Sequence, residues 1–211
     1  MRLRHVKNAQ EIVDENRNIV LLDPTVNKGK WKEVMGITDG TLSLEIGCGK
    51  GQFLTLNALE NPNNGYIGLE MMTSVICRAV QKINEKEVKN VLLINKDGIN
   101  ILDFFDEGEI DRLYINFPDP WPKARHEKRR LTSPNFLDKY KIILKKDGVF
   151  RFKTDNIDLF NYSKETILER LNSDYKCGEV DYSVPQIQTE FETKFKDAGN
   201  KIYFIEGTFK R

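Results

Sequence analysis

A short proline-rich stretch in the middle of the chain, residues 116–123, carries the residue types best suited to chemistry. It reads N-F-P-D-P-W-P-K, so one carboxylate, one indole and one ammonium group fall close together, at Asp119, Trp121 and Lys123. Proline lacks a backbone donor and restricts the residue before it, so three prolines in five residues exclude a regular strand or helix. We therefore predict a stiff loop that presents these groups at the end of the apolar run 112–115.

Four further acids resemble Asp119 in ending an apolar run. The runs are 42–46, 66–70, 91–94, 113–115 and 149–153. Because helix-length stretches separate them, the pattern predicts parallel strands that alternate with helices. The carboxyl ends of such strands meet at one edge of the sheet, where ligands bind. The acids at these ends are Glu45, Glu70, Asp97, Asp119 and Asp155. We expect them to belong to one functional site.

The remaining elements complete an α/β domain. Helices are predicted at 52–59, 74–86, 98–105, 133–146 and 156–171. Ser133 followed by Pro134 is typical of a helix start, and Asp147-Gly148 of a helix end. Apolar and polar residues alternate in two later segments, 176–182 and 202–208, which predicts an antiparallel edge. We expect a doubly wound, mostly parallel seven-stranded sheet in a single domain, residues 1–211, with 1–40 as an N-terminal extension and 41–211 as the catalytic core.

A glycine-rich turn follows the first predicted strand and indicates a cofactor. Residues 45–51 read E-I-G-C-G-K-G. Its three glycines are Gly47, Gly49 and Gly51. They permit close approach of a ligand to the backbone, but the preceding acid suits an ammonium group better than a diphosphate. Glu70 is placed to accept from ribose hydroxyls, and Asp97-Gly98 from an adenine amine. A ligand with an amino-acid head, a ribose and an adenine, but no phosphate, is S-adenosyl-L-methionine.

Composition limits the class of protein. A chain of 211 residues with a formal charge of +1, 39% hydrophobic and 31% charged residues is typical of a globular domain. Its three cysteines are widely spaced, which predicts neither a disulfide framework nor a zinc site and fits the reducing cytoplasm. No signal peptide and no membrane-spanning run is expected. Positive charge is concentrated locally at 123–130 and near the N-terminus, which favours a polyanionic partner.

The loop and the basic run behind it resemble one known family. Residues 118–123 read P-D-P-W-P-K, and residues 125–131 read R-H-E-K-R-R-L. Together with F-K-T-D-N at 152–156 and T-E-F-E at 189–192, they resemble the bacterial tRNA (guanine-N7-)-methyltransferases of the TrmB family. The resemblance extends over nearly the whole chain. Phe191 stands where a tyrosine is common in that family, which removes a hydroxyl but keeps an aromatic ring.

This resemblance implies a Rossmann-like class I methyltransferase fold, and methyl transfer from S-adenosyl-L-methionine to N7 of a guanosine in the tRNA variable loop. Asp119 is the predicted catalytic residue. The predicted cofactor-binding residues are Glu45, Gly47, Gly49, Gly51, Glu70, Asp97, Gly98 and Asp119. The predicted substrate-binding residues are Lys123, Asp155, Thr189, Glu190, Phe191 and Glu192. The predicted RNA-binding run comprises Arg125, His126, Glu127, Lys128, Arg129 and Arg130. Arg2, Arg4, Lys7, Lys28 and Lys30 are candidates for extending the RNA surface.

The chemistry of the implied reaction agrees with an acidic site. Guanine N7 carries a lone pair and no proton, so no general base is needed, and His5 and His126 are poor candidates for proton transfer. Methylation makes the base cationic, so a carboxylate stabilises charge that develops in the transition state. Trp121 and Phe191 can either stack on the base or belong to ordinary packing. The sequence leaves both alternatives open.

Two other functions are compatible with parts of the sequence. The chain could be a non-catalytic RNA-binding module on a methyltransferase fold, or a nicotinamide-dependent oxidoreductase. Glu45, Glu70 and Asp97 argue against the first, and the absence of G-x-G-x-x-G argues against the second. We expect tRNA as the partner, no metal ion, no membrane, no obligatory protein partner, and either a monomer or a homodimer.

Overall fold

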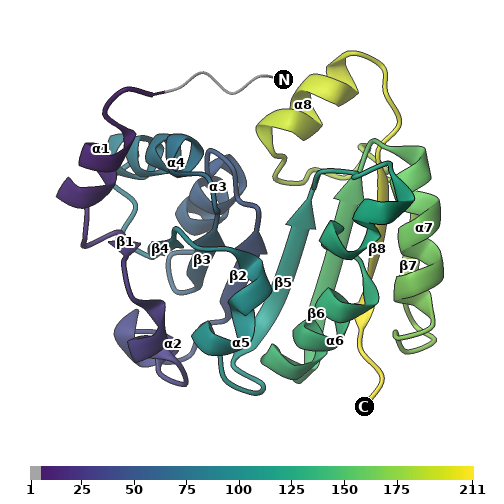
Figure 1. Cartoon of the computed structure of the whole chain (residues 1–211), viewed down its shortest axis with the longest axis horizontal. Coiled ribbons are helices and arrows are strands. Elements are labelled where there is room, and N and C mark those ends of the chain that lie inside the picture. Colours follow the sequence, from purple (N-terminus) through teal and green to yellow (C-terminus); the bar gives the residue numbers. More distant parts are fainter. Residues whose placement is uncertain (1–5) are drawn as a thin grey trace. The chain divides into compact units, whose positions relative to one another are not determined.

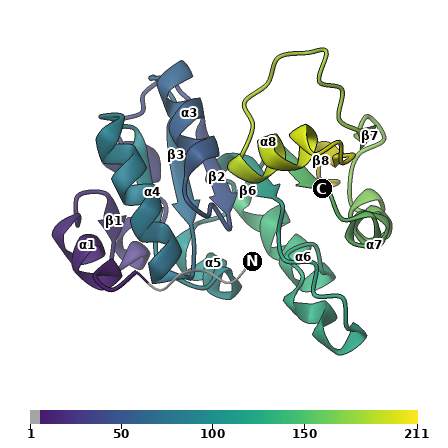
Figure 2. The same ribbon diagram turned by 90° about the horizontal axis from the view of Figure 1, so that it is seen from above.

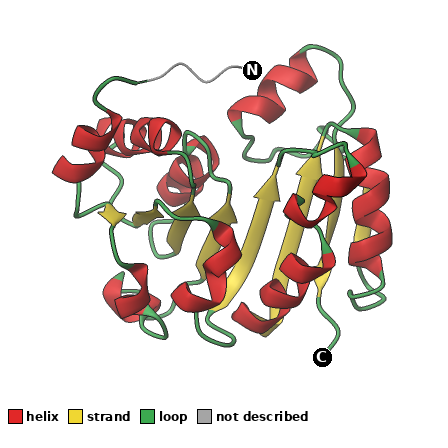
Figure 3. Cartoon of the chain, viewed as in Figure 1, coloured by secondary structure: helices red, strands yellow, loops and turns green. Residues whose placement is uncertain are grey.

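The computed structural model describes residues 6–211, and the predictions for Arg2, Arg4 and His5 lie outside these residues. The chain divides after Asp106 into two compact units. We refer to them as the N-terminal unit and the C-terminal unit. Helices alternate with strands in both of them (Figures 1 and 3). The single-domain organisation of residues 1–211 stays a prediction.

The N-terminal unit contains four parallel strands. Its helices are α1 (Ala9–Glu15), α2 (Trp31–Val34), α3 (Gln52–Glu60), α4 (Thr73–Glu85) and α5 (Ile101–Phe104), with 3₁₀ helices η1 (Pro24–Asn27) and η2 (Gly98–Asn100). Its strands are β1 (Val20–Leu21), β2 (Leu42–Ile46), β3 (Gly65–Leu69) and β4 (Val91–Ile94). Strand β4 pairs with β1 on one side and with β3 on the other, and β3 pairs with β2. Every residue of β2 and β3 is buried, as expected for parallel strands that are covered on both faces.

The segment predicted as an N-terminal extension is packed into this unit where it is described. Trp31 is fully buried, and its indole donates to the carbonyl of Phe104 at 2.8 Å. Helix α1 lies beside α4, where Val13 belongs to the same apolar cluster as Val80 (Figures 1 and 2). Strand β1 lies in this segment and is one strand more than the seven predicted, all of which fall in residues 41–211.

The C-terminal unit supplies the antiparallel edge. Its strands are β5 (Ile110–Asn116), β6 (Leu144–Thr154), β7 (Lys176–Glu179) and β8 (Tyr203–Thr208). Its helices are η3 (Ala124–Arg129), α6 (Pro134–Ile143), α7 (Ile157–Leu168) and α8 (Glu190–Asp197). Strands β5 and β6 are parallel, whereas β8 runs antiparallel to both β6 and β7. These pairings confirm the predicted mixture of parallel strands with an antiparallel edge.

The predicted ends of two helices were wrong. Helix α7 ends at Leu168 rather than at Leu171, which forms an isolated antiparallel bridge with Phe209. Helix α6 begins at Pro134 as expected, but it ends at Ile143 rather than at Lys146. Leu144 already has an extended backbone and pairs with Ile110 in β5, so strand pairing replaces the last helical turn. Ser133 occupies the N-cap position, yet its side chain makes no capping hydrogen bond.

Among residues 6–211, no helix combines the length and the apolar character needed to cross a membrane.

Candidate functional site

The glycine-rich turn of the N-terminal unit has the unusual backbone that its sequence predicts. Gly47, Gly49 and Gly51 have φ values of 74°, 57° and 73°, in the region that favours glycine. A Cβ atom at Gly51 would lie 2.8 Å from the Cβ of Ala79, so glycine allows the start of α3 to approach α4 closely. At Gly49 a Cβ atom would meet nothing within 4 Å. The backbone at Gly49 is therefore open to a ligand.

Glu70 is tied to this turn by hydrogen bonds. Its Oε2 accepts from the backbone N–H of Gly49 at 3.3 Å, and its Oε1 accepts from that of Met72 at 2.9 Å. The amide of Asn95 donates to the Glu70 carbonyl at 2.8 Å. The carboxylate is thereby held in one orientation directly after β3, as the sequence predicted.

Glu45 lies close to the same turn, and the electrostatics of Cys48 show it. Burial raises the pKa of the Cys48 thiol well above its ordinary value, and the charges of Glu45 and then Glu70 raise it further. Glu45 itself is buried within β2. Asp97 follows β4, is exposed, and accepts from the backbone N–H of Ile99 at 2.9 Å. The N-terminal unit therefore gathers two carboxylates beside the turn and presents a third after the neighbouring strand.

Residues 117–123 of the proline-rich stretch form a loop without regular structure, as predicted, and Asn116 is the last residue of β5. Phe117 and Trp121 have φ values of 51° and 41°, a left-handed conformation that is uncommon for bulky side chains and costs energy. The Phe117 N–H donates to the carbonyl of Lys153 at 2.9 Å, which fixes the start of the loop against β6. Asp119 is exposed between these two strained positions.

Arg130 holds the far end of the loop, a role that sequence reasoning missed. Its guanidinium donates to the carbonyl of Pro120 at 3.2 Å and to that of Trp121 at 3.3 and 3.1 Å. The same group lies 4.2 Å from the centre of the Tyr162 ring. Tyr162 in turn donates to Glu127 at 3.0 Å, and its pKa is raised to about 12, chiefly by burial and then by this hydrogen bond.

The other members of the basic run form η3, a 3₁₀ helix with three residues per turn. Residues three apart therefore share a face. His126 and Arg129 both lie against Trp121, with the His126 ring 5.5 Å and the Arg129 guanidinium 5.0 Å from the indole. Arg125 and Lys128 form another pair three apart, and both are exposed. The run is thus a short helix rather than a flexible segment.

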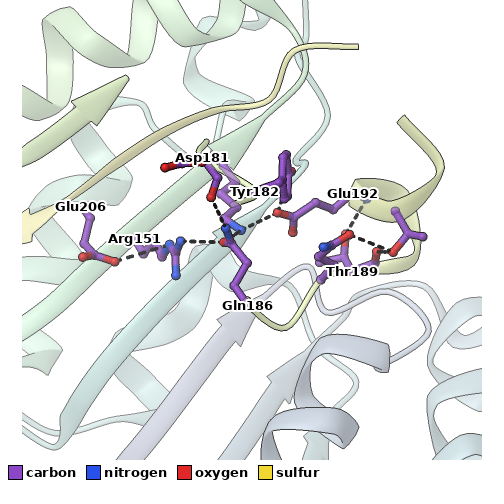
Figure 4. Close-up of polar contacts among 10 residues, drawn as sticks. Arg151, Asp181, Tyr182, Gln186, Thr189, Glu192 and Glu206 are labelled. Atoms are coloured by element: carbon purple, nitrogen blue, oxygen red, sulfur yellow. Dashed lines mark hydrogen bonds and ion pairs between the residues drawn. The ribbon is translucent and has the colours of Figure 1, made fainter. Parts of the chain in front are cut away.

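The T-E-F-E segment starts α8, where the hydroxyl of Thr189 accepts from the backbone N–H of Glu192 at 2.9 Å. This is half of a capping box, but the Glu192 side chain does not complete it. Glu192 is fully buried, and its Oε1 accepts from Lys153 at 2.5 Å and from the Tyr182 hydroxyl at 2.9 Å (Figure 4). Phe191, by contrast, is 46% exposed.

An aromatic row connects this segment with the proline-rich loop. The ring of Phe191 stacks on Phe195 with centres 6.1 Å apart, and Phe195 stacks on Phe117, also at 6.1 Å. Asp155 follows β6 and is half-buried. Phe117 therefore connects three parts of the C-terminal unit. It opens the loop that carries Asp119, contacts Phe195 of the helix that carries Phe191, and donates to Lys153 of the strand that precedes Asp155.

Comparison with known proteins identifies the family. A family model described as "Putative methyltransferase" matches residues 39–205. A protein of Streptococcus equi subsp. zooepidemicus, named tRNA (guanine-N(7)-)-methyltransferase, is 43% identical and covers 99% of this chain and 100% of its own length. The chain belongs to the tRNA (guanine-N(7)-)-methyltransferase family. A Bacillus cytotoxicus protein of the same name is 42% identical and covers 100% of this chain and 98% of its own length.

Solved structures place this tRNA (guanine-N(7)-)-methyltransferase family member among the methyltransferase folds. A structure described as an antibiotic-related methyltransferase has a TM-score of 0.67 at 19% identity, covering 90% of this chain and 99% of that chain. An S-adenosylmethionine-dependent methyltransferase from Aquifex aeolicus has a TM-score of 0.56 at 14% identity, covering 96% and 97%. These likenesses confirm the predicted α/β fold class.

Proposed function

We propose that this chain transfers a methyl group from S-adenosyl-L-methionine to N7 of a guanosine in the variable loop of tRNA. The observation that carries the proposal is the full-length similarity to tRNA (guanine-N(7)-)-methyltransferases, which includes the loop that bears Asp119. The arrangement of charges within each unit supports it.

The N-terminal unit fits the cofactor. The turn leaves open space beside Gly49, and Glu70 is oriented next to it by two backbone donors. Carboxylate oxygens keep further lone pairs after accepting one hydrogen bond each, so Glu70 can still accept from ribose hydroxyls. Glu45 supplies negative charge that suits the amino-acid ammonium, and Asp97 supplies an acceptor for the adenine amine. When bound, the cofactor supplies an electrophilic methyl group.

The proposed role of Asp119 is electrostatic. Guanine N7 needs no deprotonation, so the residues of this chain have to align the base and stabilise the positive charge that the product carries. Asp119 is an exposed carboxylate, and its loop is fixed at both ends. At the start, the Phe117 N–H donates to the backbone carbonyl of Lys153, and at the end the Arg130 guanidinium donates to the carbonyls of Pro120 and Trp121. A carboxylate held in this way stabilises the developing cation without reorganising during the reaction.

The C-terminal unit supplies the proposed contacts with the nucleoside and the RNA. Asp155, Glu190 and Phe191 offer acceptors and an aromatic face, and Thr189 starts the helix that carries two of them. Lys123 cannot act as a base toward N7, and we assign it to O6 or a phosphate. Arg125 and Lys128 are exposed on one face of η3, where phosphate contacts release counterions and give salt-dependent affinity.

The decisive experiment is a product assay with the purified chain. Radiolabelled S-adenosyl-L-methionine and bulk tRNA should yield 7-methylguanosine after digestion to nucleosides. Asp119→Asn should lower turnover by at least about 100-fold, the range that follows from losing one electrostatic group, while tRNA affinity stays close to that of the native chain. Methyl transfer to another atom, or to protein alone, would refute the proposal.

We further propose that the reaction takes place in the cytoplasm. Cys48, Cys77 and Cys177 are free thiols, which fits a reducing compartment. The proposed reaction uses tRNA as its macromolecular partner and requires neither a metal ion nor an obligatory second protein, and we expect either a monomer or a homodimer.

A further inference from the structure

A lysine at the end of β6 is buried in an unusual way. Lys153 is only 2% exposed, although lysine is seldom buried without a strong reason. Its Nζ donates to Glu192 Oε1 at 2.5 Å and to Gln186 Oε1 at 2.7 Å. Burial lowers the pKa of Lys153, and the charge of Glu192 opposes that change. The ammonium is thus held by two partners from a part of the chain more than thirty residues away in sequence.

The segment that Lys153 holds has little support of its own. Residues 180–189 contain neither helix nor strand. Gln186 also accepts from Arg151 at 3.2 Å and donates to the Asp181 carbonyl at 3.3 Å, and Figure 4 shows it between these groups. The hydroxyl of Tyr182 reaches Glu192. The side chains that fasten this segment therefore converge on Lys153 and Glu192.

An apolar pair of similar volume could fill the same space without the cost of removing two charges from water. Unlike an apolar contact, these hydrogen bonds are directional. The Lys153 ammonium therefore fixes the positions of both Glu192 and Gln186. The acceptor Glu192 stands in the first turn of α8, directly after Thr189, Glu190 and Phe191. Lys153 itself stands two residues before Asp155 in sequence. One ion pair thus connects the two sequence segments that we assign to the nucleoside.

We propose that Lys153 is a positioning residue that fixes the Thr189–Phe191 segment relative to Asp155, so that the target guanosine is held for reaction. This inference rests on the proposed function. Within it, Glu192 serves as the buried anchor of the segment, and Glu190 and Phe191 are the members that contact the nucleoside. Loss of the pair should therefore impair the use of tRNA and leave cofactor binding unchanged.

The test removes both charges together, because a single substitution would leave an unpaired buried charge and could unfold the chain. The double variant K153M/E192Q keeps the side-chain volumes and leaves an amide oxygen for the Tyr182 hydroxyl. We expect at least a tenfold lower kcat/KM for tRNA, with an unchanged Kd for S-adenosyl-L-methionine measured by calorimetry. Lys145→Met is the matched control. It removes an ion pair of the same strand, to Asp111 at 2.6 Å, at an exposed position, and should retain the native kcat/KM.

A second variant tests the positioning role of Lys153 if K153M/E192Q does not fold. Gln186→Leu removes one fastening of the segment and leaves Lys153 paired with Glu192, so folding should be preserved. We expect faster proteolytic cleavage within residues 180–189 and a severalfold lower kcat/KM for tRNA. Native cleavage rates and native kcat/KM in whichever of the two variants folds would overturn the inference. A native chain that makes no 7-methylguanosine would instead overturn the proposed function, so the two failures are distinguishable.

Discussion

Arg130 offers the sharpest test of how the Asp119 loop is held, through the substitution Arg130→Met. The change keeps the aliphatic stem but removes the three contacts to two loop carbonyls and the contact with the Tyr162 ring. Hydrogen bonds from a charged donor contribute about 1.5–3 kcal/mol when buried. For this half-buried group we take about 1 kcal/mol for each carbonyl, and about 0.5–1 kcal/mol for the cation–π contact.

The sum, about 2.5–3 kcal/mol, has to be compared with the strain of the conformation that the loop adopts. A left-handed backbone costs a residue with a side chain about 1–2 kcal/mol, and both Phe117 and Trp121 adopt it. The contacts of Arg130 are thus comparable with the strain at Trp121. Without them the loop should leave its native arrangement, and kcat should fall by up to about 100-fold, since 1.4 kcal/mol corresponds to one factor of ten. The melting temperature should fall by only about 5–10 °C.

Two measurements separate this role from the RNA contact predicted from the sequence. Single-turnover methylation of tRNA reports the chemical step, and tRNA affinity at several salt concentrations reports the number of phosphate contacts. Arg130→Met should lower the first and leave the salt dependence as in the native chain. The exposed residue Arg125 provides the control, since Arg125→Met should reduce the salt slope by about one and preserve the single-turnover rate. A reduced salt slope with native turnover in Arg130→Met would refute the reasoning.

Three further outcomes follow from the described contacts. Gly49 and Gly51 both have positive φ, so alanine at either position should lower the free energy of unfolding by about 1–2 kcal/mol. Gly51→Ala should lower it by about 1–3 kcal/mol more through overpacking against α4. Gly49→Ala adds no overpacking and should also weaken S-adenosyl-L-methionine binding, as thermal unfolding with and without the cofactor would show. In native protein, a thiol reagent at pH 8 should modify the partly exposed Cys177 well before the buried Cys48, as peptide mapping would reveal; equal rates would contradict the burial. Between pH 10 and about 12, folded protein keeps a proton on Tyr162 that the unfolded chain loses, so stability should fall with rising pH, and chemical denaturation of Tyr162→Phe should show a smaller fall.

The sequence predicted the parts of the fold whose signals are local. Buried parallel strands, a glycine turn with an acid at its start and a proline-rich loop each depend on a few adjacent residues, and all three are found. The end of α6 could not be predicted in the same way. Residues 144–146 have ordinary helix propensity, and what ends the helix is the pairing of Leu144 with Ile110 on another strand.

The roles of charged residues were the least predictable part of the candidate site. In β6, Arg151 and Lys153 alternate with apolar residues and resemble each other in sequence. Arg151 is half-buried and pairs with Glu206. Lys153 is fully buried and pairs with Glu192, which lies thirty-nine residues further along the chain. Likewise, T-E-F-E reads as a uniform motif, but its last residue points into the protein and Phe191 points outward. Such differences depend on tertiary contacts that no local pattern encodes.

The side chains of the basic run lie on three different faces of one short helix. In a 3₁₀ helix, side chains three apart lie on the same face. The pair His126 and Arg129 lies on Trp121. On another face, Glu127 accepts from the Tyr162 hydroxyl, and Arg130 lies over the Tyr162 ring and donates to the loop carbonyls. Only the face of Arg125 and Lys128 is left wholly to solvent. A cluster that looks from its sequence like a single RNA-binding patch therefore consists of two structural faces that shape the Asp119 loop and one that is free for phosphates. If the proposed RNA contact is correct, substitutions at Arg130 should affect the placement of Asp119, and substitutions at Arg125 or Lys128 should affect salt-dependent tRNA affinity.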